Sequence, residues 1–292
     1  MKDLADVVRL SRVATNGIKL HIAEAGPGDG PLLFLLHGFP EFWYGWRNQI
    51  GPLAQRGYHV VAPDQRGYNL SDKPDGVSNY DLDQLAGDIV GLADHFGRET
   101  FDVVGHDWGA SVGWCLAGQH ASRVHRFAAL NAPHPAVWLD AMRNDPVQKR
   151  KSSYVRLFQL RGVPEFLLRL GHFKALSKGF RDSIRPDAFT PSDLEGYRKA
   201  WAQPGALTAM LNYYRAVLKK PLLPPSGYRL LCSTLVIWGK RDAYASPELA
   251  ESSIQLCVDG RLAYLDQATH WAPHDEPQTV VNLLADFLGS QD

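Results

Sequence analysis

The strongest restriction on the fold comes from a glycine-flanked aspartate that lies between a strand-like segment and a helix-like segment. Gly105-His106-Asp107-Trp108-Gly109 follows the β-branched run at residues 101–104 and precedes a small, apolar stretch at 110–117. A strand, a sharp turn between glycines and a helix are typical of a nucleophile elbow, which exposes one side chain at the turn. The sequence therefore predicts that the side chain of Asp107 projects from the end of a strand.

An aspartate at this position restricts the chemistry. Its ordinary pKa is about 3.9, so the side chain is a carboxylate at neutral pH. Attack by a carboxylate on a carbonyl carbon would give a reactive anhydride, whereas attack on a saturated carbon gives an ester that water can cleave. Epoxides and alkyl halides are the electrophiles that we expect. The alternative, in which Asp107 merely caps the following helix, stays open at this point.

The composition narrows the class of protein. The 292 residues include 31 basic and 31 acidic side chains, so we expect neither a nucleic acid nor a membrane as partner. No apolar run approaches the roughly 18 residues that span a bilayer, and acidic residues near Met1 argue against a signal peptide. Cys115, Cys232 and Cys257 lack the spacing of a metal site. They are typical of buried thiols, and we expect a cytoplasmic protein.

Short apolar runs alternate with longer segments of helical periodicity. The strand-like runs cover residues 18–23, 32–36, 59–62, 101–104, 127–130, 234–238 and 261–265. The helix-like segments cover residues 42–56, 82–96, the stretch after Asp107, 247–256 and 277–288. This alternation predicts an α/β fold in which helices cover both faces of a mostly parallel sheet.

The middle of the chain breaks the alternation. We find no strand-like run from residue 135 to about residue 216, only helical segments interrupted by prolines. We therefore expect an all-helical cap at residues 135–217, inserted into a core made of residues 1–134 and 218–292. The proline-rich residues 221–225 are expected to lead the chain back to the sheet.

Two further residues have the order and placement of a catalytic triad. Asp242 follows the strand at 234–238, and His270 follows the strand at 261–265. Ligands bind at the carboxyl ends of parallel strands, and elbow hydrolases place the nucleophile, the acid and the histidine in this order along the chain. We expect His270 to activate water for cleavage of an ester on Asp107, and Asp242 to orient His270.

An oxyanion hole requires two backbone N–H groups beside the nucleophile. The expected donors are the N–H of Trp108 and that of Phe39, in the turn His37-Gly38-Phe39-Pro40. We predict a cis bond between Phe39 and Pro40, since cis peptides concentrate before proline. His106 is expected to be a packed, hydrogen-bonded histidine. For the aromatic residues from Phe39 to Trp46, a pocket wall and core packing both remain open.

These motifs resemble those of the epoxide hydrolase family of α/β-hydrolases. The matching stretches are His37 to Glu41, Asp64-Gln65-Arg66-Gly67-Tyr68, the elbow, Asp242 and His270. The resemblance extends over essentially the whole chain. It implies an α/β-hydrolase fold with a helical cap, no metal and no cofactor, and a small apolar epoxide plus water as reactants. A monomer and a homodimer are both compatible with it.

The most specific motifs that this chain shares with the family lie in the expected cap. Epoxide hydrolases similar to this chain place two tyrosines over the nucleophile, and Tyr154-Val155-Arg156-Leu157-Phe158-Gln159 and Asn212-Tyr213-Tyr214-Arg215 match their contexts. The resemblance implies that Tyr154 and Tyr214 hold the epoxide oxygen, which suits phenol donors. Together with Phe39, Trp43 and Trp108 they are the expected substrate-binding residues.

Two alternatives stay open. A haloalkane dehalogenase would share the fold and Asp107, but such enzymes often place a second halide donor where this chain has Phe39. A non-catalytic small-molecule receptor on the same fold would lack a catalytic residue, and none is missing. Thr269 and Asn69 stand where the family often has glycine, which concerns the shape of two loops more than the chemistry.

Overall fold

A computed structural model describes residues 4–183, 188–221 and 229–289. Its centre is an eight-stranded sheet in the order β1-β2-β4-β3-β5-β6-β7-β8. β2 pairs antiparallel with both β1 and β4, and all other neighbouring strands are parallel. The strands are β1 (Arg9–Thr15), β2 (Ile18–Ala25), β3 (Leu32–Leu36), β4 (His59–Pro63), β5 (Phe101–His106), β6 (Val124–Leu130), β7 (Ser233–Gly239) and β8 (Gly260–Leu265).

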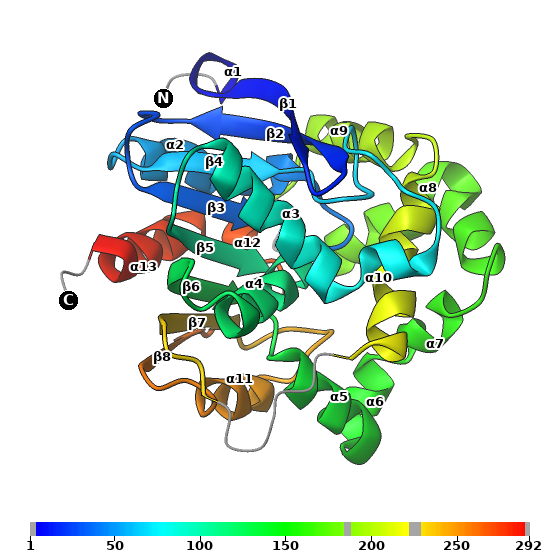
Figure 1. Ribbon diagram of the computed structural model, residues 1–292. Coiled ribbons are helices and arrows are strands. Elements are labelled where there is room, and N and C mark those ends of the chain that lie inside the picture. Colours follow the sequence, from blue (N-terminus) through cyan, green and yellow to red (C-terminus); the bar gives the residue numbers. More distant parts are fainter. Residues whose placement is uncertain (1–3, 184–187, 222–228, 290–292) are drawn as a thin grey trace.

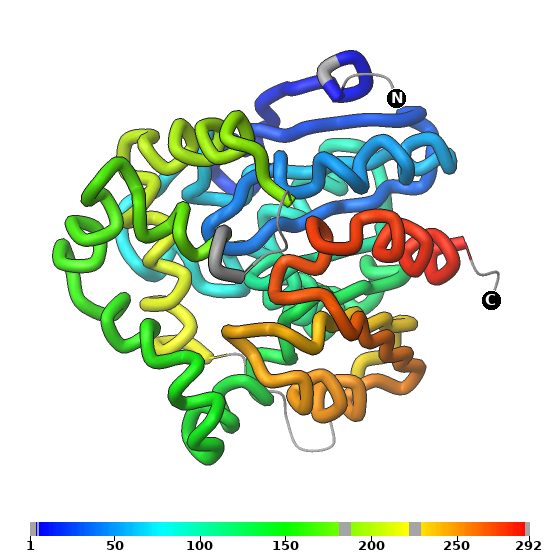
Figure 2. The backbone as a smooth tube through the Cα atoms, turned by 180° about the vertical axis from the view of Figure 1, so that it is seen from behind, coloured from blue at the N-terminus to red at the C-terminus, as the bar shows by residue number. Residues whose placement is uncertain are grey.

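Helices cover both faces of the sheet, which explains why β3, β4 and β5 are buried along their whole length. One face packs against α3 (Leu82–His95), α4 (Trp108–Gln119) and α11 (Glu248–Ile254). The other packs against α2 (Arg47–Ala54) and α13 (Pro277–Gly289), which Figure 2 shows from their own side. Shorter elements are α1 (Leu4–Val7), η1 (Trp43–Trp46), η2 (Val77–Tyr80) and α12 (Ala272–Asp275).

Six helices lie between β6 and β7 in the sequence and gather at one end of the sheet, away from both termini (Figure 1). They are α5 (Pro135–Asn144), α6 (Pro146–Lys151), α7 (Tyr154–Phe158), α8 (Val163–Ser183), α9 (Pro191–Trp201) and α10 (Ala206–Lys219). The described part of this region contains no strand, as the sequence predicts. α8 is interrupted at residues 170–173, where Gly171, His172 and Phe173 adopt left-handed backbone angles. The boundaries of a separate cap domain remain a prediction.

The predicted alternation of strands and helices is confirmed, with two differences. The edge strand β1 was not expected, because Arg9, Ser11 and Arg12 interrupt its apolar residues and their side chains face solvent or the edge. The expected helix at 42–56 is the 3₁₀ turn η1 followed by α2. Most of the expected linker at 221–225 lies outside the described residues. No helix in the described ranges has the length and hydropathy needed to cross a membrane.

Candidate active site

The turn between β5 and α4 has the geometry of a nucleophile elbow. Asp107 has φ 51° and ψ −120°, a conformation that costs a non-glycine residue energy and that is found at functional sites. Gly109 lets α4 approach the sheet, because a Cβ there would lie 1.9 Å from the carbonyl oxygen of Leu36. The side chain of Asp107 makes no capping hydrogen bond to α4. The simple helix-cap interpretation of Asp107 is therefore wrong.

The carboxylate of Asp107 instead points toward the loop after β3. The backbone N–H of Phe39 donates a hydrogen bond of 2.7 Å to Oδ1 of Asp107. A Cβ on Gly38 would lie 2.4 Å from the same oxygen, so this close approach requires glycine. The predicted cis bond between Phe39 and Pro40 is present. The loop thus brings one of the two expected oxyanion donors to Asp107, while the role of the Trp108 N–H stays a prediction.

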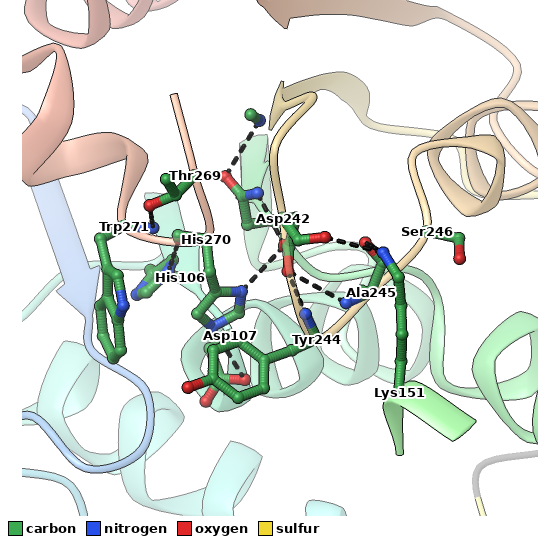
Figure 3. A network of polar contacts seen from close by, with 12 residues as sticks. His106, Asp107, Lys151, Asp242, Tyr244, Ala245, Ser246, Thr269, His270 and Trp271 are labelled. Atoms are coloured by element: carbon green, nitrogen blue, oxygen red, sulfur yellow. Dashed lines mark hydrogen bonds and ion pairs between the residues drawn. The ribbon is translucent and has the colours of Figure 1, made fainter. Parts of the chain in front are cut away.

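His270 lies between the two aspartates that the sequence singles out (Figure 3). Its Nδ1 is 2.9 Å from Oδ2 of Asp242, and its Nε2 is 3.7 Å from Oδ2 of Asp107. The imidazole and the Asp242 carboxylate are buried, whereas 22% of the Asp107 side chain is exposed. The three residues predicted as a triad therefore form a connected set with one reachable carboxylate.

The surroundings of His270 raise the pKa of its imidazole. Burial alone would lower the pKa, but the charge and the hydrogen bond of Asp242 outweigh it, helped by Asp107 and Glu41, and raise the pKa to about 8. For Asp242, burial would raise the pKa, and the neighbouring His270 together with hydrogen-bond donors lowers it. Asp242 is therefore ionised, and His270 is protonated at neutral pH in the resting site.

Every oxygen of Asp242 is occupied by a donor. The backbone N–H groups of Tyr244 and Ala245 donate to Oδ1, at 2.7 and 3.0 Å. The side-chain amide of Asn131 donates to Oδ2 at 2.8 Å, beside the bond to His270. Asn131 follows β6, so its place at the carboxyl edge of the sheet is the signal that could have identified it from the sequence.

Tyr154 and Tyr214 come together above Asp107 although 60 residues separate them along the chain. Their ring centroids are 5.9 Å apart, and both side chains line the cavities that Asp107 opens into. Burial raises the pKa of each phenol, and for Tyr154 the charge of Asp107 adds to this effect. Both hydroxyl groups therefore stay protonated and remain available as donors.

Two cavities meet at the site, and both are lined by Asp107, Tyr154, Tyr214, Tyr244 and His270. The first, of about 60 Å³, extends toward Trp138 and Ser111. The second, of about 220 Å³, extends between the cap and the loop of Phe39, and its walls are mostly apolar. They are called the small arm and the large arm below. Tyr244 was not predicted as a site residue.

The predicted substrate-binding residues are only partly brought together. The side chain of Phe39 lines the large arm, and that of Trp108 lines the small arm. Trp43 lines neither arm. Its side chain packs against the hydrophobic core, and its backbone N–H donates a hydrogen bond to Asp64. For Trp43 the structure therefore favours core packing over a place in the cavity wall.

A buried carboxylate behind the site was not assigned a role from the sequence. Oε1 of Glu41 accepts hydrogen bonds from the hydroxyl of Tyr197 at 2.7 Å and from Nε2 of His274 at 2.8 Å. Its Oε2 is 3.4 Å from Nδ1 of His106, whose Nε2 is 2.8 Å from the carbonyl oxygen of His270. His106 is therefore packed and hydrogen-bonded, as predicted, and it joins Glu41 to the loop of His270.

The structure accommodates Asn69 and Thr269, the two loop residues that stand where the family often has glycine. Asn69 adopts φ 39°, and its side chain donates to Asp64 at 2.8 Å. The hydroxyl and the N–H of Thr269 both donate to Oδ2 of Asp275 at 2.7 Å, which fixes the residue before His270. An asparagine tolerates this left-handed angle, and the threonine adds contacts that a glycine could not make.

Comparisons with known proteins agree with this architecture. A family model described as the alpha/beta hydrolase fold matches residues 31–277. The chain is 36% identical to "Epoxide hydrolase 2" of Caenorhabditis elegans over 94% of this chain and 79% of that protein. The chain belongs to the epoxide hydrolase family of α/β-hydrolases.

Two further similarities cover nearly the whole chain. The chain is 47% identical to "AB hydrolase superfamily protein YfhM" of Bacillus subtilis, over 98% of this chain and 100% of that one. The crystal structure of an epoxide hydrolase from Bacillus megaterium, in complex with an inhibitor, aligns with a TM-score of 0.87 and 32% identity. That alignment covers 96% of this chain and 100% of the other, so it includes helices α5–α10 as well as the sheet.

Proposed function

We propose that this chain hydrolyses epoxides to vicinal diols through a covalent ester on Asp107. The observation that supports this most directly is the meeting of Asp107, His270 and the two cap tyrosines at one cavity. A carboxylate, a base and two phenol donors are the groups that a two-step opening of an epoxide requires. Helices α5–α10 act in this proposal as a cap that holds the tyrosines over the sheet.

In the first step, Oδ2 of Asp107 attacks an epoxide carbon and the carbon–oxygen bond of the ring breaks. Tyr154 and Tyr214 donate hydrogen bonds to the leaving oxygen, and one of them transfers its proton. The product is a hydroxyalkyl ester on Asp107 and a phenolate. The Phe39 N–H holds Oδ1, which leaves Oδ2 on the side of His270 and the cavity.

In the second step, His270 takes a proton from water, and the hydroxide attacks the carbonyl carbon of the ester. The N–H groups of Phe39 and Trp108 stabilise the oxyanion. The tetrahedral intermediate collapses, His270 gives its proton to the departing diol oxygen, and the proton left on the carboxyl group returns to the phenolate. Esterification removes the charge of Asp107, which lowers the pKa of His270, so His270 releases its resting proton to solvent before it takes one from water. It is protonated again once the carboxylate of Asp107 is restored.

The sizes of the two arms favour an epoxide with one apolar substituent. The large arm, at about 220 Å³, exceeds the roughly 150 Å³ of an apolar cavity that holds benzene. The small arm, at about 60 Å³, is far smaller than that benzene-sized cavity but exceeds the roughly 10–15 Å³ that one water needs. An aryl or medium-length alkyl group fits the large arm, and the small arm retains room for water.

The side chain at position 39 argues against the dehalogenase alternative. Phe39 presents an aromatic ring to the large arm, and its side chain offers no donor to a halide ion. Trp108 alone would have to hold the halide. An epoxide oxygen, in contrast, can accept hydrogen bonds from both phenols.

Mass spectrometry tests the covalent route. His270→Gln incubated with a styrene-type epoxide should accumulate an ester on the peptide that contains Asp107, because attack remains possible and hydrolysis does not. A single turnover of the unaltered enzyme in heavy-oxygen water should place the label in Asp107. Label in the diol but not in Asp107 would show direct attack by water, and absence of any diol from epoxides would reject the proposed activity.

A further inference from the structure

The exposed apolar residues of this protein are concentrated on one part of the cap. Among the described residues, twelve large hydrophobic side chains are exposed, and six of these lie between residues 157 and 170. We call these six the outer cap face: Leu157, Leu160, Val163, Phe166, Leu167 and Leu170. Phe166 is the most exposed of them, at 64%. Exposed apolar side chains concentrated in one segment are typical of an interaction site.

The first half of α8 is apolar on two opposite sides. Val163, Phe166, Leu167 and Leu170 follow the i, i+3, i+4, i+7 spacing of one helix face, and that face is exposed. Leu168 is 9% exposed and lines the large arm from the inner side. An apolar face of a helix is normally covered by a neighbouring element. The outer side of α8 therefore lacks a partner within the described chain.

The charges around the outer cap face have one sign. Residues 156–178 include five basic side chains and one acidic side chain, although the whole chain is balanced. The acid, Glu165, is already paired with Arg215 at 2.9 Å. Arg156, Arg161 and Arg169 are exposed and alternate with the apolar residues. Exposed leucine and phenylalanine flanked by arginine and lysine are typical of helices that lie in the interface of a membrane.

A second copy of the chain fits this face less well. In a two-fold dimer the outer cap face would meet itself, so that Arg161 and Arg169 of one subunit would approach the same basic residues of the other. Like charges opposed across an interface oppose association. A surface with an apolar interior and a negatively charged boundary would complement both the apolar side chains and the arginines of the outer cap face.

We propose that the outer cap face binds the surface of an anionic lipid bilayer. This departs from the expectation of no membrane partner, which was drawn from the balanced charge of the whole chain, because the basic excess is local to residues 156–178. Phe166, Leu167 and their apolar neighbours enter the acyl boundary, and the arginines contact the negative head groups. Both views show α8 on the outside of the cap, at the end away from the termini (Figures 1 and 2). The inner side of α8 lines the large arm with Leu168 and Leu176. If the proposed function holds, an apolar epoxide dissolved in the bilayer would be next to its cavity.

Sedimentation with lipid vesicles tests the binding without any assay of hydrolysis. The protein should bind phosphatidylcholine vesicles that contain phosphatidylserine at least about tenfold better than vesicles of phosphatidylcholine alone, since each basic residue near the surface adds to binding. The binding should weaken between about 0.1 M and 1 M salt, where the screening length falls to roughly 3 Å. Equal binding to both vesicles, or to neither, would overturn the proposal.

Matched variants separate this face from the general surface. Phe166→Glu with Leu167→Glu should abolish sedimentation, whereas Leu231→Glu with Val258→Glu, at positions 73% and 62% exposed, should not. Arg161→Glu with Arg169→Glu should weaken binding far more than the equal charge change of Lys19→Glu with Arg56→Glu. Unchanged melting midpoints control for folding. If gel filtration instead shows a dimer that Phe166→Glu with Leu167→Glu dissociates, without vesicle binding, a second copy covers this face and the proposal is wrong.

Discussion

The backbone N–H of Phe39 donates a hydrogen bond to the carboxylate of Asp107, 68 residues later in the chain, at 2.7 Å. This contact joins the loop after β3 to the elbow after β5 and fixes one carboxylate oxygen. The other oxygen is left toward His270. The bond depends on a close approach of the two loops, which only a glycine at position 38 permits.

Gly38→Ala should therefore damage the site more than the fold. The added Cβ would lie 2.4 Å from the Asp107 carboxylate and would displace it. A misplacement of about 1 Å can cost roughly 100-fold in rate, so we expect kcat/KM to fall by about that factor. Gly28→Ala is the control, since a Cβ there meets nothing within 4 Å. Similar rates for both variants would argue against positioning of Asp107 by this loop.

Removal of the Asp107 charge should lower the pKa of His270. Opposing its burial, the charge of Asp242 and then that of Asp107 raise this pKa to about 8. In Asp107→Asn only the contribution of Asp107 is lost, so the protonated imidazole becomes less favourable and the titration moves to lower pH. NMR of the His270 ring measures the shift, and Asp29→Asn, at an exposed position, should leave it unchanged.

The lower pKa of His270 after loss of the Asp107 charge also determines how the rate of ester hydrolysis changes with pH. His270 acts as a base only when neutral, so the rate of this step should rise with pH and level off above the pKa of the esterified enzyme. Because the ester lacks the charge of Asp107, this pKa should lie below the value of about 8 in the resting enzyme. Stopped-flow single turnovers would measure it. A midpoint above that of the resting enzyme would contradict the proposed sequence of steps.

The two cap tyrosines should act in ester formation and not in ester hydrolysis. General acids contribute roughly 10² to 10⁴ in rate, so Tyr154→Phe with Tyr214→Phe should lower the rate of alkylation by a factor in that range. Each single variant should lose less, because one phenol remains. Tyr264→Phe, in β8 and outside both arms, serves as the control. Burst kinetics separate the two steps, and an equal loss in both would show general damage to the cavity.

Trp138 should exclude epoxides with two large substituents. It lies in the small arm, where its indole N–H donates to the hydroxyl of Ser152 at 3.3 Å. Trp138→Ala should raise kcat/KM for a 1,2-disubstituted epoxide, relative to a styrene-type epoxide, by about 10-fold or more, the scale on which apolar pockets discriminate. Leu168→Ala enlarges the large arm instead and should not change that ratio in the same direction. A ratio that neither variant alters would reject the assignment of the arms.

Much of the site was predictable because its residues follow strands. Asp107 comes directly after β5, and Asp242 and His270 lie in the loops that follow β7 and β8. Parallel strands bring such residues to one edge of the sheet. Tyr154 and Tyr214 could not be placed by this argument, since they belong to helices α7 and α10, whose packing over the sheet has no local signal. Only their resemblance to family motifs identified them.

The network of buried residues behind the site could not be predicted from the sequence. Glu41, His106 and His274 come from three separate segments, and nothing in the local pattern of any of them indicates that they form one network. The pairing depends on the turn after Pro40 and on α12, whose positions are set by tertiary packing. Trp43 illustrates the same limit, because its side chain packs against the core although Phe39, four residues earlier, lines the large arm.

Glu41 should therefore be a large contributor to stability. Its carboxylate is buried, and although burial would raise its pKa, His274 and His106 hold the pKa well below the ordinary value. Glu41→Ala leaves the buried donors of Tyr197 and His274 without their acceptor, and each buried donor left unsatisfied costs roughly 1–3 kcal/mol. Urea denaturation should show a decrease of that size in the free energy of unfolding, against almost none for the exposed Glu99→Ala. A small decrease for Glu41→Ala would mean that water or another group replaces the carboxylate in this network.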